Sequence, residues 1–214
     1  MANPGRDMAF KALMVDVDGV VVVPRTGGWA VDMETDLGLS ITTLQARFFT
    51  PHWDDVANGR AALHDRLAPV LADIAPHLNS RTLTDYWFAK DAQLDLTLLA
   101  DLAALRATGV PLHLATVQEH ERAAYLWDTL RLRERFDGLH HSAAVGCGKP
   151  DPAYFAAVEA RTGFAPADLV LIDDKAANVE AARAAGWGGA LWDGTRRLAD
   201  VLSGPAVSAS PPSP

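Results

Sequence analysis

Residues 11–19 read KALMVDVDG, a short apolar run that ends in two aspartates and a glycine. Residues 169–175, LVLIDDK, repeat this arrangement late in the chain. Buried strands of parallel sheets have nearly continuous apolar runs rather than strict alternation, and both stretches fit that pattern. We therefore predict two buried parallel strands, each of which delivers a pair of acids to the same edge of a sheet.

Further apolar runs extend this sheet, and helical patterns separate them. The predicted strands are Lys11–Val17, Val110–Thr116, Leu139–Ser142, Leu169–Asp173 and Gly189–Trp192. The helices predicted between them are Asp95–Ala107, Glu119–Leu130, Pro152–Arg161 and Ala176–Ala185. Alternating strands and helices are typical of a doubly wound, Rossmann-like α/β fold, in which functional groups gather at the carboxyl ends of the strands.

A long stretch before Asp95 breaks this alternation and has helical character. The helices predicted within it are Leu37–Phe49, Gly59–Ile74 and Thr82–Lys90. A structureless loop of that length would be unusual in a compact domain. We predict an inserted helical cap of residues 24–93 on a core of residues 1–23 and 94–202. The Pro- and Ser-rich tail, residues 203–214, is expected to be flexible.

Composition narrows the possible environments and partners. The chain has 214 residues and a formal net charge of −8, which argues against nucleic-acid binding because such proteins carry a basic surface. Cys147 is the only cysteine, so no internal disulfide can form. The first residues lack the apolar segment of a secretory signal, and no run approaches the ~18–20 apolar residues of a membrane helix. We expect a cytoplasmic monomer or homodimer with no membrane partner.

Four acids lie at the ends of the two strands quoted first. Asp16 and Asp18 end the first strand, and Asp173 and Asp174 end the second. Two carboxylates about 4 Å apart repel by roughly 4 kcal/mol at an effective dielectric constant near 20. Such a cluster must be neutralised by protons or by cations. Oxygen ligands without a partnering Cys or His indicate a hard ion, and we expect Mg²⁺.

Two other residues fit a phosphoryl group held beside that ion. Thr116 ends the second strand of the core and offers a hydroxyl. Lys149 lies between two predicted core elements and offers an ammonium, and it is one of only four lysines in the chain. Neither residue is specific alone, but both have the chemistry that phosphate oxygens require.

Other motif interpretations fail on the sequence itself. The loop that begins at Asp16 is not an EF-hand, because its twelfth position is Gly27 rather than glutamate. The segment around Lys149 is not a P-loop, since residue 143 is alanine where a glycine is required and no Ser or Thr follows the lysine. Cys147 has no evident histidine partner that would make it a nucleophile.

Taken in order, four motifs resemble those of the haloacid dehalogenase superfamily. They are DVDGV from Asp16, Thr116, Lys149 within GKPDPAYF, and LIDDKAANVEAARAAG from Leu171. The resemblance covers Lys11 to Trp192, and the position of the insert matches the subfamily whose helical cap lies between the first and second motifs. Within that subfamily the chain is similar to bacterial sugar-phosphate phosphatases.

The resemblance implies a role for each of the four acids. Asp16 would be the nucleophile that becomes an aspartyl-phosphate, and Asp18 the general acid and base. Mg²⁺ would be held by Asp16, the main-chain carbonyl of Asp18, and Asp174. Asp173 would lie close by or act through a bridging water.

The resemblance also implies which groups bind the phosphoryl oxygens: Thr116, the backbone amide of Val117, and Lys149. The second motif departs from the family pattern, because Val117 stands where asparagine is common. The backbone amide is retained, but a side-chain hydrogen-bond partner is lost. Gln118, the next residue, could replace it.

The leading hypothesis is a Mg²⁺-dependent phosphatase that acts on a small phosphorylated metabolite, with a sugar phosphate as the expected substrate. A 2-haloacid dehalogenase shares the fold and the nucleophile but ordinarily lacks the second aspartate, so Asp18 favours phosphoryl transfer. A phosphomutase would retain both aspartates. A non-catalytic member of the superfamily stays open because Val117 departs from the pattern. A receiver domain has a similar acidic pair but no helical insert.

The segment from Arg47 to Arg60 is the part of the cap with the clearest functional pattern. We expect Phe48, Phe49 and Trp53 to form the small core of the cap. His52 and Arg60 are the candidates for substrate contact, since a bundle this small cannot readily bury their charges. A mobile cap of this kind would select the substrate and exclude water from the phosphoryl site.

Overall fold

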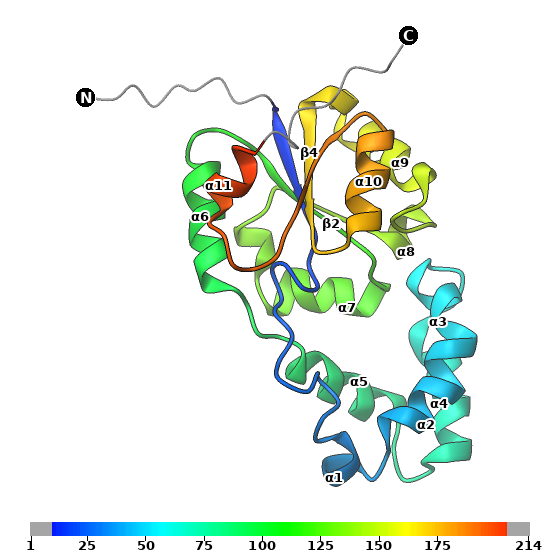
Figure 1. The fold of residues 1–214 in the computed structure, drawn as a ribbon. Helices are drawn as coiled ribbons and strands as arrows, with labels where there is room; N and C mark the ends of the chain where they lie inside the picture. The colour runs from blue at the N-terminus through cyan, green and yellow to red at the C-terminus, as the bar shows by residue number, and fades with distance from the viewer. Residues whose placement is uncertain (1–9, 205–214) are drawn as a thin grey trace.

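The computed structural model describes residues 10–204 and has a five-stranded parallel sheet at its centre (Figure 1). The strands are β1 (Ala12–Val15), β2 (Leu112–Thr116), β3 (Gly138–His141), β4 (Leu169–Asp173) and β5 (Gly188–Leu191). All five strands expected from the sequence are present, which confirms the doubly wound α/β core. Of the tail expected to be flexible, residues 205–214 lie outside the described residues.

The strand order, β3-β2-β1-β4-β5, places the first strand in the middle of the sheet. Val15 of β1 pairs with Leu114 of β2 on one side and with Ile172 of β4 on the other. The chain builds one half of the sheet outward from β1 and then returns to build the other half. The carboxyl ends of β1, β2 and β4 therefore meet at the switch point where α/β proteins bind their ligands.

Helices cover both faces of the sheet (Figure 1). The helices on one face are α6 (Leu96–Arg106), α7 (His120–Ala124) with a π-helical turn (Tyr125–Thr129), a 3-10 turn (Leu132–Glu134) and α11 (Leu198–Leu202). The elements on the other side are α8 (Ser142–Val145), α9 (Pro152–Thr162), a 3-10 turn (Pro166–Asp168) and α10 (Ala176–Ala184). Alternate residues of each strand feed the two layers, as the period of a strand requires.

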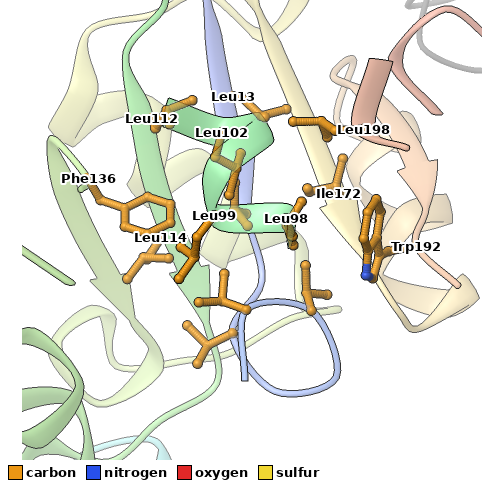
Figure 2. Close-up of a cluster of buried hydrophobic side chains, with 14 of the residues drawn as sticks. Leu13, Leu98, Leu99, Leu102, Leu112, Leu114, Phe136, Ile172, Trp192 and Leu198 are labelled. Atoms are coloured by element: carbon orange, nitrogen blue, oxygen red, sulfur yellow. The ribbon is translucent and has the colours of Figure 1, made fainter. Parts of the chain in front are cut away.

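Figure 2 shows the larger layer, where leucines of α6 pack onto the strands. Leu99 and Leu102 belong to the same buried cluster as Leu13 and Ile172, and all four are at most 2% exposed. Asp95 begins the helix by accepting a hydrogen bond from the Leu98 main-chain nitrogen at 2.9 Å. Truncating a leucine in such a layer to alanine typically costs about 2–5 kcal/mol. This packing holds the strand ends, and therefore the acids, in fixed positions.

The cap consists of α1 (Met33–Leu37), α2 (Ile41–Leu44), α3 (Thr50–Ala57), α4 (Leu63–Ile74) and α5 (Ser80–Lys90), with a π-helical turn (Gln45–Phe49) joining α2 to α3. It has a hydrophobic cluster separate from those of the sheet. Phe48 is buried in this cluster, and Phe49 and Trp53 pack against it. The ring of Trp53 lies 5.6 Å from that of Trp87, so aromatic packing stabilises the face of the cap near the cleft.

The predicted helix Leu37–Phe49 is wrong at both ends. Leu37 closes α1, because Gly38 takes a left-handed conformation with φ of 67°. Ser40 then caps a new helix with its side chain. That helix continues through the π-helical turn to Ala57, and Pro51 lies at the start of α3, directly after the π-helical turn.

The predicted helix Gly59–Ile74 begins later, at Leu63. Gly59 has a φ of 71° and ends the preceding helix rather than starting the next. A side chain at this position would place its Cβ only 2.3 Å from the carbonyl oxygen of Ala143 in the core. Glycine is therefore required both by the backbone and by the approach of the cap to the core.

Two linkers join the cap to the core, and they run side by side. Val22 and Leu94 form an antiparallel bridge, and the Val23 nitrogen donates to the Gln93 carbonyl at 2.8 Å. The Asp95 nitrogen donates to the Val21 carbonyl at 2.9 Å. The cap therefore leaves and rejoins the core at one place, directly after Asp18. Within residues 10–204, no helix is long and apolar enough to cross a bilayer.

Candidate active site

Three of the predicted acids meet at the carboxyl edge of the sheet. Asp16, Asp173 and Asp174 each offer a carboxylate oxygen, and these oxygens lie within 4.8 Å of one another. The pairing of β1 with β4 brings them together, since the Asp16 nitrogen donates to the Ile172 carbonyl at 3.0 Å. The cluster follows from the strand ends, as the sequence indicated.

Lys149 supplies a positive charge inside this cluster. Its side chain is fully buried; its Nζ donates to Asp173 and lies 3.1 Å from Asp16 Oδ1. A buried ammonium without a partner would be strongly unfavourable, and here two carboxylates surround it. The structure thus brings Lys149 to the acids. The sequence had indicated this residue because lysine is rare in the chain and because Lys149 lies between two predicted core elements.

The two adjacent acids, Asp173 and Asp174, have different surroundings. Asp173 is completely buried, and both of its oxygens accept hydrogen bonds. The donors are Lys149, the Asn178 amide at 3.0 Å and the Lys175 nitrogen at 2.9 Å. Asp173 is therefore engaged by protein donors.

Asp174, in contrast, has a free carboxylate that faces the loop after β1. No other residue in the described chain donates a side-chain or main-chain hydrogen bond to it. Gly19 has a φ of 80°, and a Cβ there would lie 2.4 Å from Asp174 Oδ2. The glycine therefore leaves the space that the Asp174 carboxylate occupies beside residues 16–18.

The donor set fits a magnesium ion. Asp16 and Asp174 offer carboxylate oxygens to a common point, and neither cysteine nor histidine belongs to the group. Mg²⁺ prefers such hard oxygen ligands and keeps several waters, so a few protein ligands suffice. Burial raises the pKa of Asp16 to about 6, with Lys149 lowering it and Asp173 raising it. Partial desolvation also raises the pKa of Asp174, which Lys175 opposes. A cation between these carboxylates would favour their charged forms.

Asp18 stands apart from the three-carboxylate group. The Gln118 amide donates to its Oδ2 at 2.6 Å. Asp18 is solvent-accessible, but the surrounding core and cap atoms still desolvate it enough to raise its pKa, and the Arg122 charge opposes this rise. Its side chain is thus available to reacting groups. Gln118 is engaged with Asp18, which differs from the substrate contact considered from the sequence.

A cleft of about 590 Å³ lies between core and cap beside this site. Its core wall includes Val117 and residues 147–151, with Lys149 among them. Thr116 is buried at the end of β2, next to Val117. Of the three predicted phosphate-binding residues, Val117 and Lys149 therefore line the cleft, and Thr116 is buried beside Val117.

The cap wall includes Phe49, Trp53, Asn58 and Arg60. Arg60 reaches the cleft, but its guanidinium pairs with Asp54 and donates to Asp55 at 2.9 Å, so acids of the cap already match its charge. His52 is outside the lining, and its ring packs 6.2 Å from that of Phe48. The structure thus brings only one of the two proposed cap residues to the cleft.

Two hydrogen bonds join the cap to the core outside the linkers, and the sequence held no signal for them. The Ser142 hydroxyl of α8 donates to the Ala57 carbonyl at the end of α3, at 2.5 Å. His64 of α4 and Glu121 of α7 form a hydrogen bond of 2.8 Å. These contacts join residues far apart along the chain, so the cap is seated on the core at two points away from the linkers.

Arg122 anchors the cap on the side of the linkers, and the sequence pattern did not single out this residue. It is 1% exposed, and it donates to the Phe88 carbonyl at 3.2 Å and to the main-chain carbonyl of Asp91. Its guanidinium lies 5.3 Å from the Phe88 ring and 5.5 Å from the Tyr125 ring. A buried arginine from α7 therefore caps the last turn of α5 and fixes the return linker.

Comparison with known proteins gives a family match over most of the chain. Residues 10–186 match the model of the haloacid dehalogenase-like hydrolases. The matched stretch contains every strand from β1 to β4, the whole cap and all the candidate site residues.

Solved structures have the same fold. A haloacid dehalogenase family enzyme from Bacteroides thetaiotaomicron, an aspartate-to-alanine mutant in complex with magnesium and inorganic phosphate, superimposes with a TM-score of 0.76 at 15% identity, covering 91% of this chain and 100% of that one. A predicted family hydrolase from Porphyromonas gingivalis gives 0.72 at 19% identity, over 88% and 93%. The L-2-haloacid dehalogenase of Xanthobacter autotrophicus, with chloropropionic acid covalently bound, gives 0.61 at 20% identity, over 85% and 77%. These matches establish the fold.

One curated relative matches part of the chain. The chloroplastic flavin mononucleotide hydrolase 1 of Arabidopsis thaliana is 33% identical over 85 residues. The match covers 40% of this chain and 35% of the relative, so the similarity spans about a third of the relative's length.

Proposed function

The chain belongs to the haloacid dehalogenase-like hydrolases, and on this premise we propose that it is a Mg²⁺-dependent phosphatase of a small phosphorylated metabolite. One observation carries the proposal. Asp16 and Asp174 offer carboxylate oxygens to one point, and the buried Lys149, which lines the cleft, lies 3.1 Å from Asp16, while Asp18 stands outside this carboxylate cluster. A nucleophile, a cation site and a separate acid are what phosphate ester hydrolysis requires.

Hydrolysis would proceed in two displacements on phosphorus. An oxygen of Asp16 attacks the phosphorus, the bond from phosphorus to the ester oxygen breaks, and Asp18 gives its proton to the departing alkoxide. Water then attacks the aspartyl-phosphate, Asp18 takes a proton from that water, and phosphate leaves as the Asp16 carboxylate is restored. A single residue acts as acid and then as base because its proton is consumed in the first step.

The remaining residues would hold the charges in place. Asp16, Asp174 and the main-chain carbonyl of Asp18 would hold Mg²⁺, with Asp173 retained by Lys149 and Asn178 behind them. When bound, the ion offsets negative charge on the phosphoryl group. Thr116, the Val117 nitrogen and Lys149 would contact the phosphoryl oxygens. An anionic substrate could enter among carboxylates only with such compensation.

A sugar phosphate is the first substrate class that we propose. A cleft of about 590 Å³ accommodates a metabolite of that size. Asn58 of its cap wall donates its amide nitrogen to Asp54, which leaves the side-chain carbonyl oxygen to accept from hydroxyl groups. A second candidate is a phosphate ester that carries a planar ring. Phe49 and Trp53 on the cap wall favour it, and the partial similarity to a flavin mononucleotide hydrolase agrees with it. A phosphomutase would share the residues and differ only in its product.

Activity measurements on the purified chain test the proposal. Sugar phosphates, flavin mononucleotide, p-nitrophenyl phosphate and 2-chloropropionate would be supplied with Mg²⁺ or with EDTA, using Asp16→Asn as the matched control. Phosphate release that requires Mg²⁺ and Asp16 supports the proposal. Halide release that persists in EDTA would identify a dehalogenase, and no turnover of any ester would favour a non-catalytic member. Isomerised product without phosphate release would identify a mutase.

A further inference from the structure

Gln118 is the side chain in the described chain that donates to the Asp18 carboxyl group. Its Nε2 lies 2.6 Å from Asp18 Oδ2. The residues are far apart in sequence, so the contact results from the folded arrangement of β1 and β2. Neither Gln118 nor Asp18 lines the cleft, and the Gln118 amide nitrogen is engaged with the acid.

The backbone of Gln118 is firmly held. The residue is 3% exposed, and its carbonyl accepts from the Ala143 nitrogen at 3.2 Å. The next residue, Glu119, caps α7 by accepting from the Glu121 nitrogen at 2.7 Å. The Gln118 amide is therefore presented to Asp18 from a fixed segment between β2 and α7.

The contact distinguishes the two oxygens of Asp18. A protonated carboxyl group has one hydroxyl oxygen and one carbonyl oxygen, and an amide N–H can only donate. An N–H that points at Oδ2 favours the form in which Oδ2 is the carbonyl oxygen and Oδ1 carries the proton.

We propose that Gln118 is a positioning residue, which orients Asp18 so that Oδ1 delivers the proton to the leaving group. The inference rests on the proposed function, because it requires Asp18 to act as the general acid. Gln118 itself touches no reacting atom. Gln118 therefore does not replace, at the substrate, the asparagine side chain that is common at the position of Val117. It donates to Asp18 instead.

The test compares two leaving groups. Proton donation matters most when the departing oxygen is basic, and general acid catalysis contributes about 10²–10⁴-fold. Gln118→Met keeps the length of the side chain and removes the donor. We expect kcat to fall about 30-fold on an alkyl phosphate such as glycerol phosphate, but only about threefold on p-nitrophenyl phosphate, with KM little changed for either. Gln118→Asn retains an amide, but its side chain is too short to reach Asp18. We expect this variant to show the same kcat losses as Gln118→Met, so the test stands even if the methionine variant folds poorly.

A double-mutant cycle with Asp18→Asn separates positioning from packing. If Gln118 acts through Asp18, then Gln118→Met should cause no further loss in the Asp18→Asn background. Equal losses on the two esters, or fully additive losses in the cycle, would overturn the inference and leave the proposed function standing. Failure of the unmodified chain to hydrolyse any phosphate ester would overturn both.

Discussion

The two walls of the cleft manage their charges in opposite ways. On the core wall, Lys149 and Asp173 are paired with no exposed side-chain surface. On the cap wall, Arg60 and Asp54 are paired with 48% and 86% of their side chains exposed. Exposed ion pairs contribute little to stability, whereas breaking a buried pair leaves an uncompensated charge. The core wall therefore fixes its charges for chemistry, and the cap wall can change with little cost to the fold.

This contrast assigns different tasks to the two regions. Substitutions in the core wall should affect turnover or folding, because the buried charges of Lys149 and Asp173 hold each other. Substitutions in the cap wall should affect the choice and affinity of substrate. Each of the following experiments could contradict that division.

The largest expected effect is the loss of turnover in Asp16→Asn. An amide is a poor nucleophile and cannot form the aspartyl-phosphate, so we expect a fall of at least about 10⁴-fold on p-nitrophenyl phosphate. Circular dichroism should show an unchanged fold. Retention of wild-type turnover would remove Asp16 from the role of nucleophile and the core wall from its part in the chemistry.

The next effect separates the adjacent acids. Asp173→Ala should lower the free energy of unfolding by about 3–5 kcal/mol, because it leaves the Lys149 ammonium buried without its closest partner. Asp174→Ala should change it by no more than about 0.5 kcal/mol, since the carboxylate is solvent-accessible and has no protein donor in the described chain. Urea unfolding of both variants measures the difference.

The effect of the same two variants on the Mg²⁺ dependence of activity should have the opposite order. Asp174→Ala should abolish or sharply weaken the Mg²⁺ dependence of activity, and Asp173→Ala should do so less. The rise in Tm on adding Mg²⁺ to the wild type should vanish in Asp174→Ala, because only binding to the folded state stabilises it. A reversed order would mean that Asp173 is the direct ligand.

Lowering the pH should reduce the stability of the core before that of the cap. The expected effect is smaller than that of the preceding substitutions. His140, 8% exposed, has its pKa lowered from 6.5 to about 4, first by burial and then by the nearby His113. Between these values the unfolded chain binds more protons, so the contribution of His140 is complete above about pH 6.5 and is lost as the pH falls toward 4. We expect about 2 kcal/mol of this loss by pH 5.

Urea unfolding at about pH 7.5 and 5 would show this loss as a steeper pH dependence in the wild type than in His140→Leu. His77, an exposed histidine of the cap, provides the control. His77→Leu makes the same histidine-to-leucine change on the surface of the cap, away from the buried core. Identical slopes for all three proteins would remove His140 from this role.

The smallest effect concerns neighbouring residues of the cap. Trp53 lines the cleft and His52 does not. Trp53→Ala should raise KM for the physiological substrate by about 10-fold while sparing kcat on p-nitrophenyl phosphate, the result of losing uniform binding. His52→Ala is the matched control, and Arg60→Ala should fall between the two because acids of the cap hold its charge. Equal damage to kcat on both substrates would place Trp53 in the catalytic machinery or the fold.

The parts of the fold that could be predicted are those coded locally. The runs that end at Asp16 and at Asp173 each carry their own apolar pattern and their own acid. A parallel sheet then requires the strand ends to meet, so all four acids were expected together without coordinates. Three of them converge, and Asp18 lies outside the cluster. Lys149 could be added because a rare lysine lay between two core elements.

The rest depended on contacts that no local pattern encodes. The Gln118 amide could have faced the substrate or the acid, and only the packing of the segment after β2 decides between them. The cap contact through Ser142 and the arginine anchor at Arg122 join carbonyls whose positions depend on the whole fold. The boundary at Gly38 was different, because a glycine followed by Ser40 is a recognisable stop and start signal that could have been used.

The paired linkers have a consequence for how the chain folds. Leu13 and Leu112 are partners in the central pair of strands, yet the entire cap separates them along the chain. In an unstructured chain, pairing them would require closing a long loop, and such non-local contacts slow folding. A cap that has already formed its local helices brings its two ends together at Val22 and Leu94, so it acts as a short connection. Early folding of the cap would thereby help the central strands of the sheet to pair.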